Sequence, residues 1–381
     1  MPAEQILTNA RVVTADEVFL GTVAVRNGLI HDVSEGVSQL PQAQDLEGDY
    51  LLPGLIELHT DNLEKYMNPR PGVDWPPASA VLAHDAQIVA AGITTVFDAL
   101  AIGDVNPKGE RMRQLPIMQS AIAEAEQRGH TRAEHRLHLR CELSHEQTLE
   151  VFNELVESPL VQMVSVMDHS PGQRQFAKME KYREYYQGKY HLSDAEMEVF
   201  IETQIANSRR YSDDYRRAIA VECRQRSLAI ASHDDATVEH AQESADYGMS
   251  IAEFPTTVEA ATVSHQLGLK VLMGAPNIVR GGSHSGNVAA ADLADRGVLD
   301  ILSSDYYPSS LLQAARLLAD NNEGYDLPRA MRTISLAPAR AVGLNDRGEI
   351  RNGLRADLVR AKSHDKQFVV HHVWRSGRRV F

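Results

Sequence analysis

Residues 52–66, LPGLIELHTDNLEKY, join an apolar run to an abrupt cluster of polar and charged side chains. The apolar run ends in His59, Thr60 and Asp61. Successive side chains of a strand point to opposite faces, so His59 and Asp61 share one face. Imidazole and carboxylate groups are ligands that suit zinc, manganese or iron(II). The stretch therefore predicts a strand that carries a metal-binding pair at its carboxyl end.

The same pattern, a short apolar strand followed by a helical pattern, recurs along the middle of the chain. Eight strand candidates can be counted between GLIELHTD, at residues 54–61, and LDILSSDYY, at residues 299–307. Alternating strands and helices in about this number are typical of an α/β fold of the (β/α)8 TIM-barrel type. One connection, from Ser170 to roughly Arg210, is much longer than the others. Long structured insertions of this kind are often lids or substrate loops.

Both ends of the chain have a different pattern, with short alternating strands separated by glycine turns. We therefore predict a small β-sandwich domain formed by both chain termini, residues 1–54 and 345–381. Residues 55–344 are expected to form a metal-dependent barrel hydrolase domain. Edge strands of a small sheet often pair between copies, so the sequence leaves a homo-oligomer open.

Polar side chains gather where the predicted barrel strands end. They are His59, Asp61, Asp98, Glu142, Asp168, His169, His233, Asp234, Asp235, Glu253 and Asp305. In a barrel these ends converge on the face that carries the active site. From them we select six predicted metal ligands: His59, Asp61, Glu142, His169, His233 and Asp305. Six mixed nitrogen and oxygen donors are too many for one tetrahedral zinc and fit a centre of two divalent ions (Zn, Mn or Fe) about 3.5–4 Å apart.

Each predicted ligand has a structural alternative. A single histidine at a strand end is more often a hydrogen-bonded structural residue than a ligand. Glu142 shares its strand face with His138 and Arg140, so an internal salt-bridge network is a rival interpretation. Asp305 could cap the helix that follows it. Taken as a set, the residues favour metal binding, and the chain has no phosphate-loop, nucleophile-elbow or H-E-x-x-H motif that would favour another chemistry.

Composition narrows the class of protein. The 381 residues are 43% hydrophobic and carry a formal net charge of −14, which argues against general binding to nucleic acid or to an anionic membrane. Two cysteines give no disulfide framework and fit a reducing compartment. No apolar run approaches the length of a membrane span, and the first residues lack the apolar core of a signal peptide. We expect a cytoplasmic protein.

Two segments carry a resemblance to a known superfamily. LLPGLIELHTD, residues 51–61, resembles the first-strand motif PG-[LIF]-ID-x-H-x-H of the amidohydrolase superfamily. GEIRNGLRADLV, residues 348–359, resembles its carboxyl-terminal segment G-x-I-x-x-G-x-x-A-D-[LF]-V. Asp61 stands where most members have a second histidine.

Longer blocks resemble one member family that shares this departure. They include PRPGVDWP (residues 69–76), MDHSPGQRQF (residues 167–176) and GAPNIVRGGSHSGN (residues 274–287). The family is that of the α-D-ribose 1-methylphosphonate 5-triphosphate diphosphatases of bacterial carbon–phosphorus lyase pathways. The resemblance implies a barrel with a β-sandwich, a divalent-metal site, and hydrolysis of the triphosphate to 5-phospho-α-D-ribose 1-methylphosphonate and diphosphate in phosphonate catabolism.

Such a ribosyl triphosphate phosphonate is strongly anionic, so an acidic chain needs local cations to bind it. The predicted substrate-binding residues are Lys65, Arg70, Arg174, Arg280 and His284. Asp305 is the predicted acceptor of the proton of the attacking water, and His233 is the second predicted catalytic residue.

Two other functions stay open at this stage. One is an amidohydrolase that cleaves a C–N bond, such as a cyclic amidase or a deaminase. The other is a non-catalytic scaffold of a phosphonate pathway complex.

Overall fold

The computed structural model describes residues 4–104, 111–174, 179–283 and 286–381. The strands are β1 (Gln5–Val13), β2 (Val18–Arg26), β3 (Leu29–Glu35), β4 (Gln44–Asp45), β5 (Tyr50–Pro53), β6 (Leu55–Thr60), β7 (Ile93–Ile102), β8 (Glu134–Glu142), β9 (Val161–Met167), β10 (Ala229–His233), β11 (Ile251–Glu253), β12 (Lys270–Gly274), β13 (Ile301–Ser303), β14 (Leu358–His364), β15 (Gln367–Arg375) and β16 (Arg378–Arg379). The helices are α1 (Leu63–Met67), α2 (Pro77–Ala90), α3 (Arg111–Gln127), α4 (Thr148–Leu155), α5 (Met179–Tyr190), α6 (Asp194–Gln225), α7 (Val238–Asp246), α8 (Val258–Gln266), α9 (Ala275–Arg280), α10 (Ala290–Asp295), α11 (Ser310–Asn321), α12 (Leu327–Arg332) and α13 (Leu336–Ala341).

The central sheet has eight strands that follow one another in chain order from β6 to β13. Neighbouring strands pair in parallel, as in the registers β8–β9, β9–β10 and β10–β11. The first and last strands also meet, because Thr60 at the end of β6 forms a parallel bridge with Asp305 after β13. Every residue of β6, β7, β11 and β13 is buried, which is the continuous apolar pattern of parallel strands covered on both faces. The predicted (β/α)8 barrel is confirmed.

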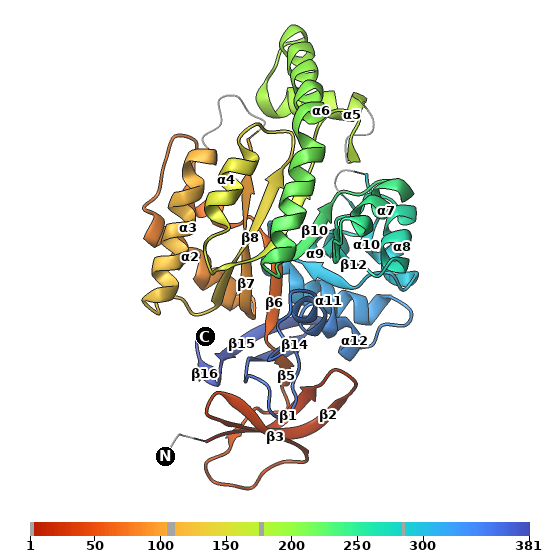
Figure 1. Cartoon of the computed structure of the whole chain (residues 1–381). Helices are drawn as coiled ribbons and strands as arrows, with labels where there is room; N and C mark the ends of the chain where they lie inside the picture. The colour runs from red at the N-terminus through yellow and green to blue at the C-terminus, as the bar shows by residue number, and fades with distance from the viewer. Residues whose placement is uncertain (1–3, 105–110, 175–178, 284–285) are drawn as a thin grey trace. The chain divides into compact units, whose positions relative to one another are not determined.

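The second sheet is built from both ends of the chain, in the order β16-β15-β14-β5-β1-β2-β3, with β4 beside β1. Figure 1 shows the N-terminal strands in red and the C-terminal strands in blue within this sheet. The β2–β3 hairpin turns at Asn27 and Gly28, whose φ angles of 56° and 79° are those of the Asn-Gly hairpin turn. Leu7, Leu51 and Trp374 belong to one buried apolar cluster, so the two termini share a core.

The chain divides into two compact units, and each is described by itself. The first unit contains Met1–Asp98, Ile122–Arg136 and Met273–Phe381, and the second contains Ala99–Ala121 and Leu137–Leu272. The whole terminal sheet lies in the first unit. Its strands fall inside the predicted sheet segments, while the predicted domain boundaries near residues 54 and 345 stay a prediction.

A buried polar network in the first unit joins α2 to β7 and β8. Nε2 of His84 lies 2.7 Å from Oδ1 of Asp98, and Nδ1 of His135 lies 2.7 Å from Oδ2 of Asp98. Nε2 of His135 lies 3.4 Å from Asp85. Burial alone would raise the pKa of Asp98, but the charges of His135 and His84 lower it to about 2. The side chain of Asp98 thus faces a helix, so grouping it with the strand-end residues of the active face was wrong.

The long connection after β9 is helical in its described part. It contains α5 and the first half of α6, which Figure 1 shows as a hairpin in the second unit. Ser193 begins α6 with a capping box, in which its side chain accepts from the backbone of Glu196 and the Glu196 side chain accepts from the backbone of Ser193. The rings of Tyr182, Tyr186 and Phe200 hold the two helices together. Its role as a lid or substrate loop stays a prediction.

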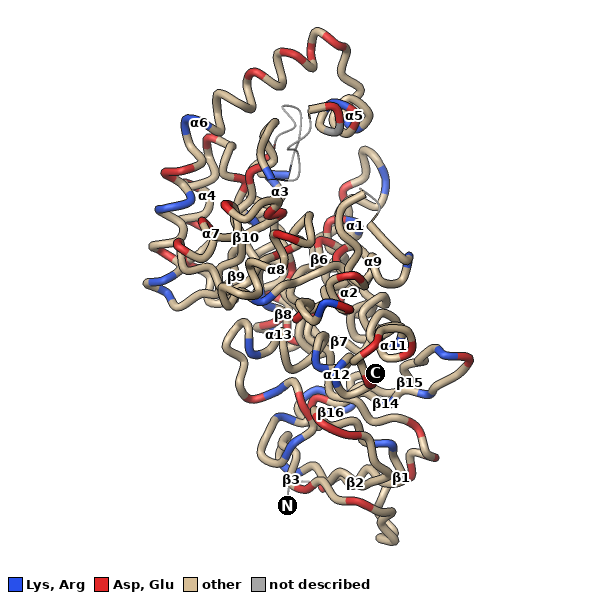
Figure 2. Tube along the Cα trace, turned by 90° about the vertical axis from the view of Figure 1, so that its right-hand side faces the viewer, with Lys and Arg blue, Asp and Glu red and all other residues tan. Residues whose placement is uncertain are grey.

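Two basic side chains of this hairpin, Arg183 and Lys189, meet partners within it. Figure 2 shows acidic positions along the first half of α6, with basic positions further along the helix. Arg183 forms a 2.6 Å ion pair with Glu198, and Nζ of Lys189 lies over the rings of Tyr185 and Tyr190. No helix among the residues described combines the length and the apolar character needed to cross a bilayer.

Candidate active site

The site residues of the first unit lie where β6 meets β13. The backbone oxygen of His59 accepts hydrogen bonds from the Asp305 backbone N–H, at 3.1 Å, and from Oγ of Ser303, at 2.8 Å. Oγ1 of Thr60 donates to the carbonyl oxygen of Asp305 at 2.7 Å. The first and last barrel strands therefore bring His59 and Asp305, which are far apart in the sequence, to adjacent positions.

Two carboxylates accompany His59 on β6 and after it. Glu57 is fully buried and accepts hydrogen bonds from the backbone N–H groups of His59, at 2.6 Å, and Ser304, at 2.5 Å. Burial raises the pKa of Glu57 to about 7, although these hydrogen bonds oppose the shift. Asp61 follows the strand, and among the described residues its Oδ1 atom is buried and has no hydrogen-bond partner. A buried carboxylate oxygen without a donor is costly, and a cation would relieve that cost.

In the second unit, Glu142 and His169 meet at the ends of β8 and β9. Oε2 of Glu142 lies 2.6 Å from Nδ1 of His169, and Oε1 accepts from the backbone N–H of His169 at 3.1 Å. Oε1 also accepts from Oγ of Ser144 at 2.8 Å. Burial alone would lower the pKa of His169, but the charges of Glu142 and Asp234 raise it to about 10. The salt-bridge network of Glu142 with His138 and Arg140 that rivalled metal binding is not the arrangement seen in this unit.

Asp234 joins the two histidines of the second unit. Its Oδ2 atom lies 2.9 Å from Nδ1 of His233 and 3.4 Å from Nε2 of His169. The two imidazole rings are 5.7 Å apart and nearly perpendicular, at 78°. Asp234 has a left-handed backbone, with φ of 58°, because the chain turns sharply as it leaves β10. The fold therefore brings two of the predicted ligands, His169 and His233, against the same acid, Asp234.

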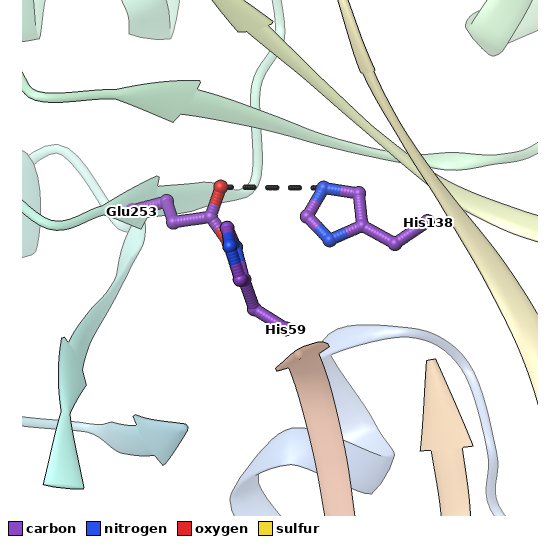
Figure 3. A group of neighbouring side chains, drawn as sticks. All are labelled: His59, His138 and Glu253. Atoms are coloured by element: carbon purple, nitrogen blue, oxygen red, sulfur yellow. Dashed lines mark ion pairs between the residues drawn. The ribbon is translucent and has the colours of Figure 1, made fainter. Parts of the chain in front are cut away.

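A further acid and a further histidine come from β11 and β8. Figure 3 draws the ion pair between Nε2 of His138 and Oε2 of Glu253, which are 4.0 Å apart. The same Oε2 atom lies 3.8 Å from Nε2 of His233. Nε2 of His138 also lies 2.9 Å from Oγ of Ser165. The side chains of His138 and Glu253 are fully buried. Because Glu253 lies close to both His138 and His233, it extends the cluster around His233.

The basic residues predicted to bind substrate are found in different surroundings. Lys65, Arg70 and Arg280 are exposed in the first unit, and Nζ of Lys65 donates to the carbonyl oxygen of Tyr306 at 2.5 Å. Arg174 is buried in the second unit and pairs with Asp235 and, at 3.0 Å, with Glu243. Burial and the nearby charge of Arg216 lower the pKa of Arg174 to about 10. His284 lies outside the described residues.

Comparisons with known proteins identify the family of this chain. The model of the Amidohydrolase family matches residues 50–380. The chain belongs to the amidohydrolase family. A curated relative, the alpha-D-ribose 1-methylphosphonate 5-triphosphate diphosphatase of Escherichia coli (strain K12), is 57% identical over 377 residues, which cover 99% of this chain and 100% of the relative. The predicted family resemblance is confirmed.

Solved structures of more distant amidohydrolases share the fold. An N-acetyl-D-glucosamine-6-phosphate deacetylase from Mycobacterium smegmatis is 16% identical, with a TM-score of 0.65 and 99% of both chains covered. A 5-methylcytosine deaminase from Klebsiella pneumoniae is 15% identical, with a TM-score of 0.66 and coverage of 99% of this chain and 98% of the deaminase. At this identity the likeness shows the fold alone.

The donor groups of this amidohydrolase fit a divalent cation. Ligand atoms of His169, His233 and Asp234 all lie within 4.8 Å of one another. Imidazole nitrogens and carboxylate oxygens are the donors that zinc, manganese and iron share. In the first unit, taken by itself, Asp61 has a buried carboxylate oxygen without a hydrogen-bond donor among the described residues. Amidohydrolase membership and this chemistry support divalent metal binding.

Three residues of these clusters were outside the predicted ligand set: Asp234, Glu253 and His138. In the sequence, Asp234 and Glu253 were grouped with the polar residues at strand ends. A signal was available for Asp234, because SHDD at residues 232–235 places two acids directly after His233. No comparable signal marks His138, whose neighbours in HRLHLRCE, residues 135–142, alternate between polar and apolar as in any strand.

Proposed function

We propose that this chain is a metal-dependent hydrolase that cleaves α-D-ribose 1-methylphosphonate 5-triphosphate to 5-phospho-α-D-ribose 1-methylphosphonate and diphosphate. The observation that carries the proposal is the full-length relationship, at 57% identity, to a diphosphatase of that name. Strand-end carboxylates and imidazoles of the kind this chemistry needs are present in both compact units. The substrate is a small anionic molecule, and the proposed compartment is the cytoplasm, which the two free, buried cysteines suit.

The proposed metal ligands are His59, Asp61, Glu142, His169, His233 and Asp305, which would hold two divalent cations. When bound, such cations lower the pKa of a water molecule to about 7 and offset negative charge on a phosphoryl group. Asp234 would orient His169 and His233, because one of its carboxylate oxygens lies close to a ring nitrogen of each.

Asp305 is the proposed proton acceptor. It follows the last barrel strand, next to His59, and it would take the proton of a water that attacks the phosphorus nearest the ribose. The bond from that phosphorus to the oxygen bridging to the next phosphorus would break, so diphosphate leaves and the monophosphate stays on the sugar. Hydrolysis of this kind depends on positioning and on charge stabilisation more than on covalent chemistry.

The substrate phosphates would be bound by cationic side chains of the first unit. Lys65 and Arg70 come shortly after β6, and Arg280 ends α9. All three are exposed, so their charges are open to a ligand. Arg174 and His284 remain further proposed contributors from the sequence, and Arg174 is the weaker of the two because Asp235 and Glu243 already neutralise it.

Hydrolysis in ¹⁸O-labelled water, followed by ³¹P NMR, tests the proposal. The expected products are diphosphate and a ribosyl 5-monophosphate, with the label in the monophosphate. Label in diphosphate would place the attack on another phosphorus, and release of orthophosphate would mean another phosphohydrolase. Ammonia or a carboxylate released from cyclic amides and aminated bases, with the triphosphate left intact, would instead indicate C–N bond cleavage.

The proposed scaffold role makes a different prediction. If the chain acts only within a complex, exchanging both Glu142 and His169 for alanine would leave pathway turnover unchanged. Loss of turnover in the purified double variant, with an unchanged thermal midpoint, would support catalysis.

A further inference from the structure

The barrel of this protein closes through a short seam between β6 and β13. β13 has only three residues, so few regular ladder bonds are available at this junction. Side chains supply several of the connections: Ser303 Oγ donates to the His59 carbonyl, Thr60 Oγ1 donates to the Asp305 carbonyl, and Glu57 accepts from two backbone N–H groups. The position of the last strand against the first therefore depends on a few polar side chains.

Glu57 holds both strands with one carboxylate group, whose two oxygens each accept a backbone N–H. One carboxylate oxygen accepts from the N–H of His59 on β6, at 2.6 Å, and the other accepts from the N–H of Ser304 after β13, at 2.5 Å. The carboxylate has no exposed surface. Water cannot replace either bond without opening the seam, so both amides depend on Glu57.

The residues fixed by Glu57 are direct neighbours of the proposed chemistry. The N–H of His59 belongs to a proposed metal ligand, and Ser304 immediately precedes Asp305. Asp305 has a left-handed backbone, with φ of 55°, which a non-glycine residue keeps only when its surroundings hold it there. The hydrogen bond from the Ser304 N–H to Glu57 holds the backbone directly before this turn.

We propose that Glu57 is a positioning residue, which ties the start and the end of the barrel together and so sets the placement of His59 and Asp305. It does not touch the reacting atoms. The inference rests on the proposed function only through the roles given to His59 and Asp305.

The charge and shape of the side chain explain why a carboxylate is needed here. Two N–H donors converge on Glu57, and a carboxylate offers only acceptors in its ionised form. A glutamine has the same size, but its NH2 group would face one of the two N–H groups whichever way the amide turned. Aspartate keeps both acceptors but is shorter by one methylene, so it cannot hold both amides at the same distances.

Glu57→Gln is the decisive variant, and Asp49→Asn is its matched control. Asp49 is also a buried carboxylate of the first unit, but its Oδ2 atom accepts from Nε of Arg360, at 2.7 Å, near the terminal sheet. Hydrogen exchange of the His59 and Ser304 amides, bound metal per chain, kcat and KM are measured for both variants and for the wild type. Hydrogen exchange and metal content do not depend on which substrate the enzyme takes.

In Glu57→Gln we expect exchange of the His59 and Ser304 amides to be faster by about tenfold or more, because one buried hydrogen bond is replaced by a clash of donors. We also expect weaker metal binding and a kcat lower by at least about tenfold, with KM little changed, because misplaced groups affect turnover more than binding. Exchange of the Ile230-bonded amide of Ser250, in the other unit, should not change. Asp49→Asn should keep the kcat and metal content of the wild type.

Several results would overturn the proposal. One is a Glu57→Gln protein with wild-type exchange, metal content and kcat. Another is faster exchange throughout the chain, with no excess at His59 and Ser304, which would mean a general loss of stability. If Glu57→Gln does not fold, Glu57→Asp replaces it, and wild-type behaviour of that variant contradicts the proposal, while an intermediate effect supports it. If wild-type enzyme fails to cleave the triphosphate, the proposed function is wrong, and exchange and metal content still decide the role of Glu57.

Discussion

Nδ1 of His169 lies 2.6 Å from Oε2 of Glu142, although the two residues are 27 positions apart in the chain. Each follows or ends a barrel strand, and β8 and β9 are neighbours in the sheet. Parallel strands place their carboxyl ends together, and this is how side chains from separate parts of a sequence form one cluster. Asp234 extends the cluster from the next strand, β10.

Replacing His233 by alanine should lower the diphosphatase kcat by at least about 100-fold, because a ligand imidazole contributes at least as much as the groups that orient it. Asp234 would keep only its contact with His169. The kcat is measured at saturating metal, and circular dichroism should show an unchanged fold. Normal turnover by a metal-replete sample would remove His233 from the site.

Asp305→Asn should keep metal bound and lower kcat by about 100-fold or more, which is the range expected for loss of a general base. The amide keeps the size of the side chain but accepts a proton poorly. Steady-state kinetics give kcat, and elemental analysis of the same sample gives the bound metal. A kcat near that of the wild type would mean that another group, such as Asp234, accepts the proton.

Arg280 and Arg174 should respond differently to alanine substitution. Arg280 is exposed, so Arg280→Ala should raise KM for the triphosphate and leave the thermal midpoint unchanged. Arg174 pairs with the buried carboxylate of Asp235, so Arg174→Ala should destabilise the fold by about 3–5 kcal/mol, the cost of breaking one partner from a buried ion pair. Chemical denaturation and KM separate the two effects. An Arg174→Ala protein of normal stability with a raised KM would instead support the sequence-based role in substrate binding.

Stability of the metal-free protein should fall as pH rises through the alkaline range. Burial alone would lower the pKa of His135, but the charge of Asp98 and contact with Asp85 raise it from 6.5 to about 10. A raised folded-state pKa contributes stability that is fully present below pH 6.5 and is lost as pH approaches about 10. Urea denaturation between these limits should therefore give a steeper decline for the wild type than for His135→Gln. His130→Gln, which changes an exposed histidine nearby, should behave as the wild type, and equal slopes for all three proteins would contradict the role of His135.

The sequence was sufficient for the barrel, the terminal sheet and the family, since a strand with its ligand pair and a matching carboxyl-terminal segment bracket the chain. It was not sufficient to say which way a polar side chain points. Asp98 and Glu142 both stand in or at the end of buried strands, but Asp98 faces α2 and Glu142 meets His169. Strand alternation gives relative faces within one strand and does not say which face is inside the barrel.

The role of Glu57 could not be predicted from the sequence, because it depends on a tertiary contact. In the sequence it is one acid within an apolar run, and nothing local pairs it with Ser304, which lies 247 residues further along the chain. That bond exists because the last strand returns to the first. For Arg174, the sequence suggested a role that the fold makes weaker. Its position shortly after His169 suggested substrate binding, but in the structure it pairs with the carboxylates of Asp235 and Glu243.

Removal and return of metal tests the central claim most directly. Enzyme treated with a strong chelator and dialysed should contain no divalent metal by elemental analysis and should release no diphosphate from the ribosyl triphosphate, and adding zinc, manganese or iron(II) back should restore both metal content and turnover in proportion. Full-rate release of diphosphate by the verified metal-free enzyme would contradict the account.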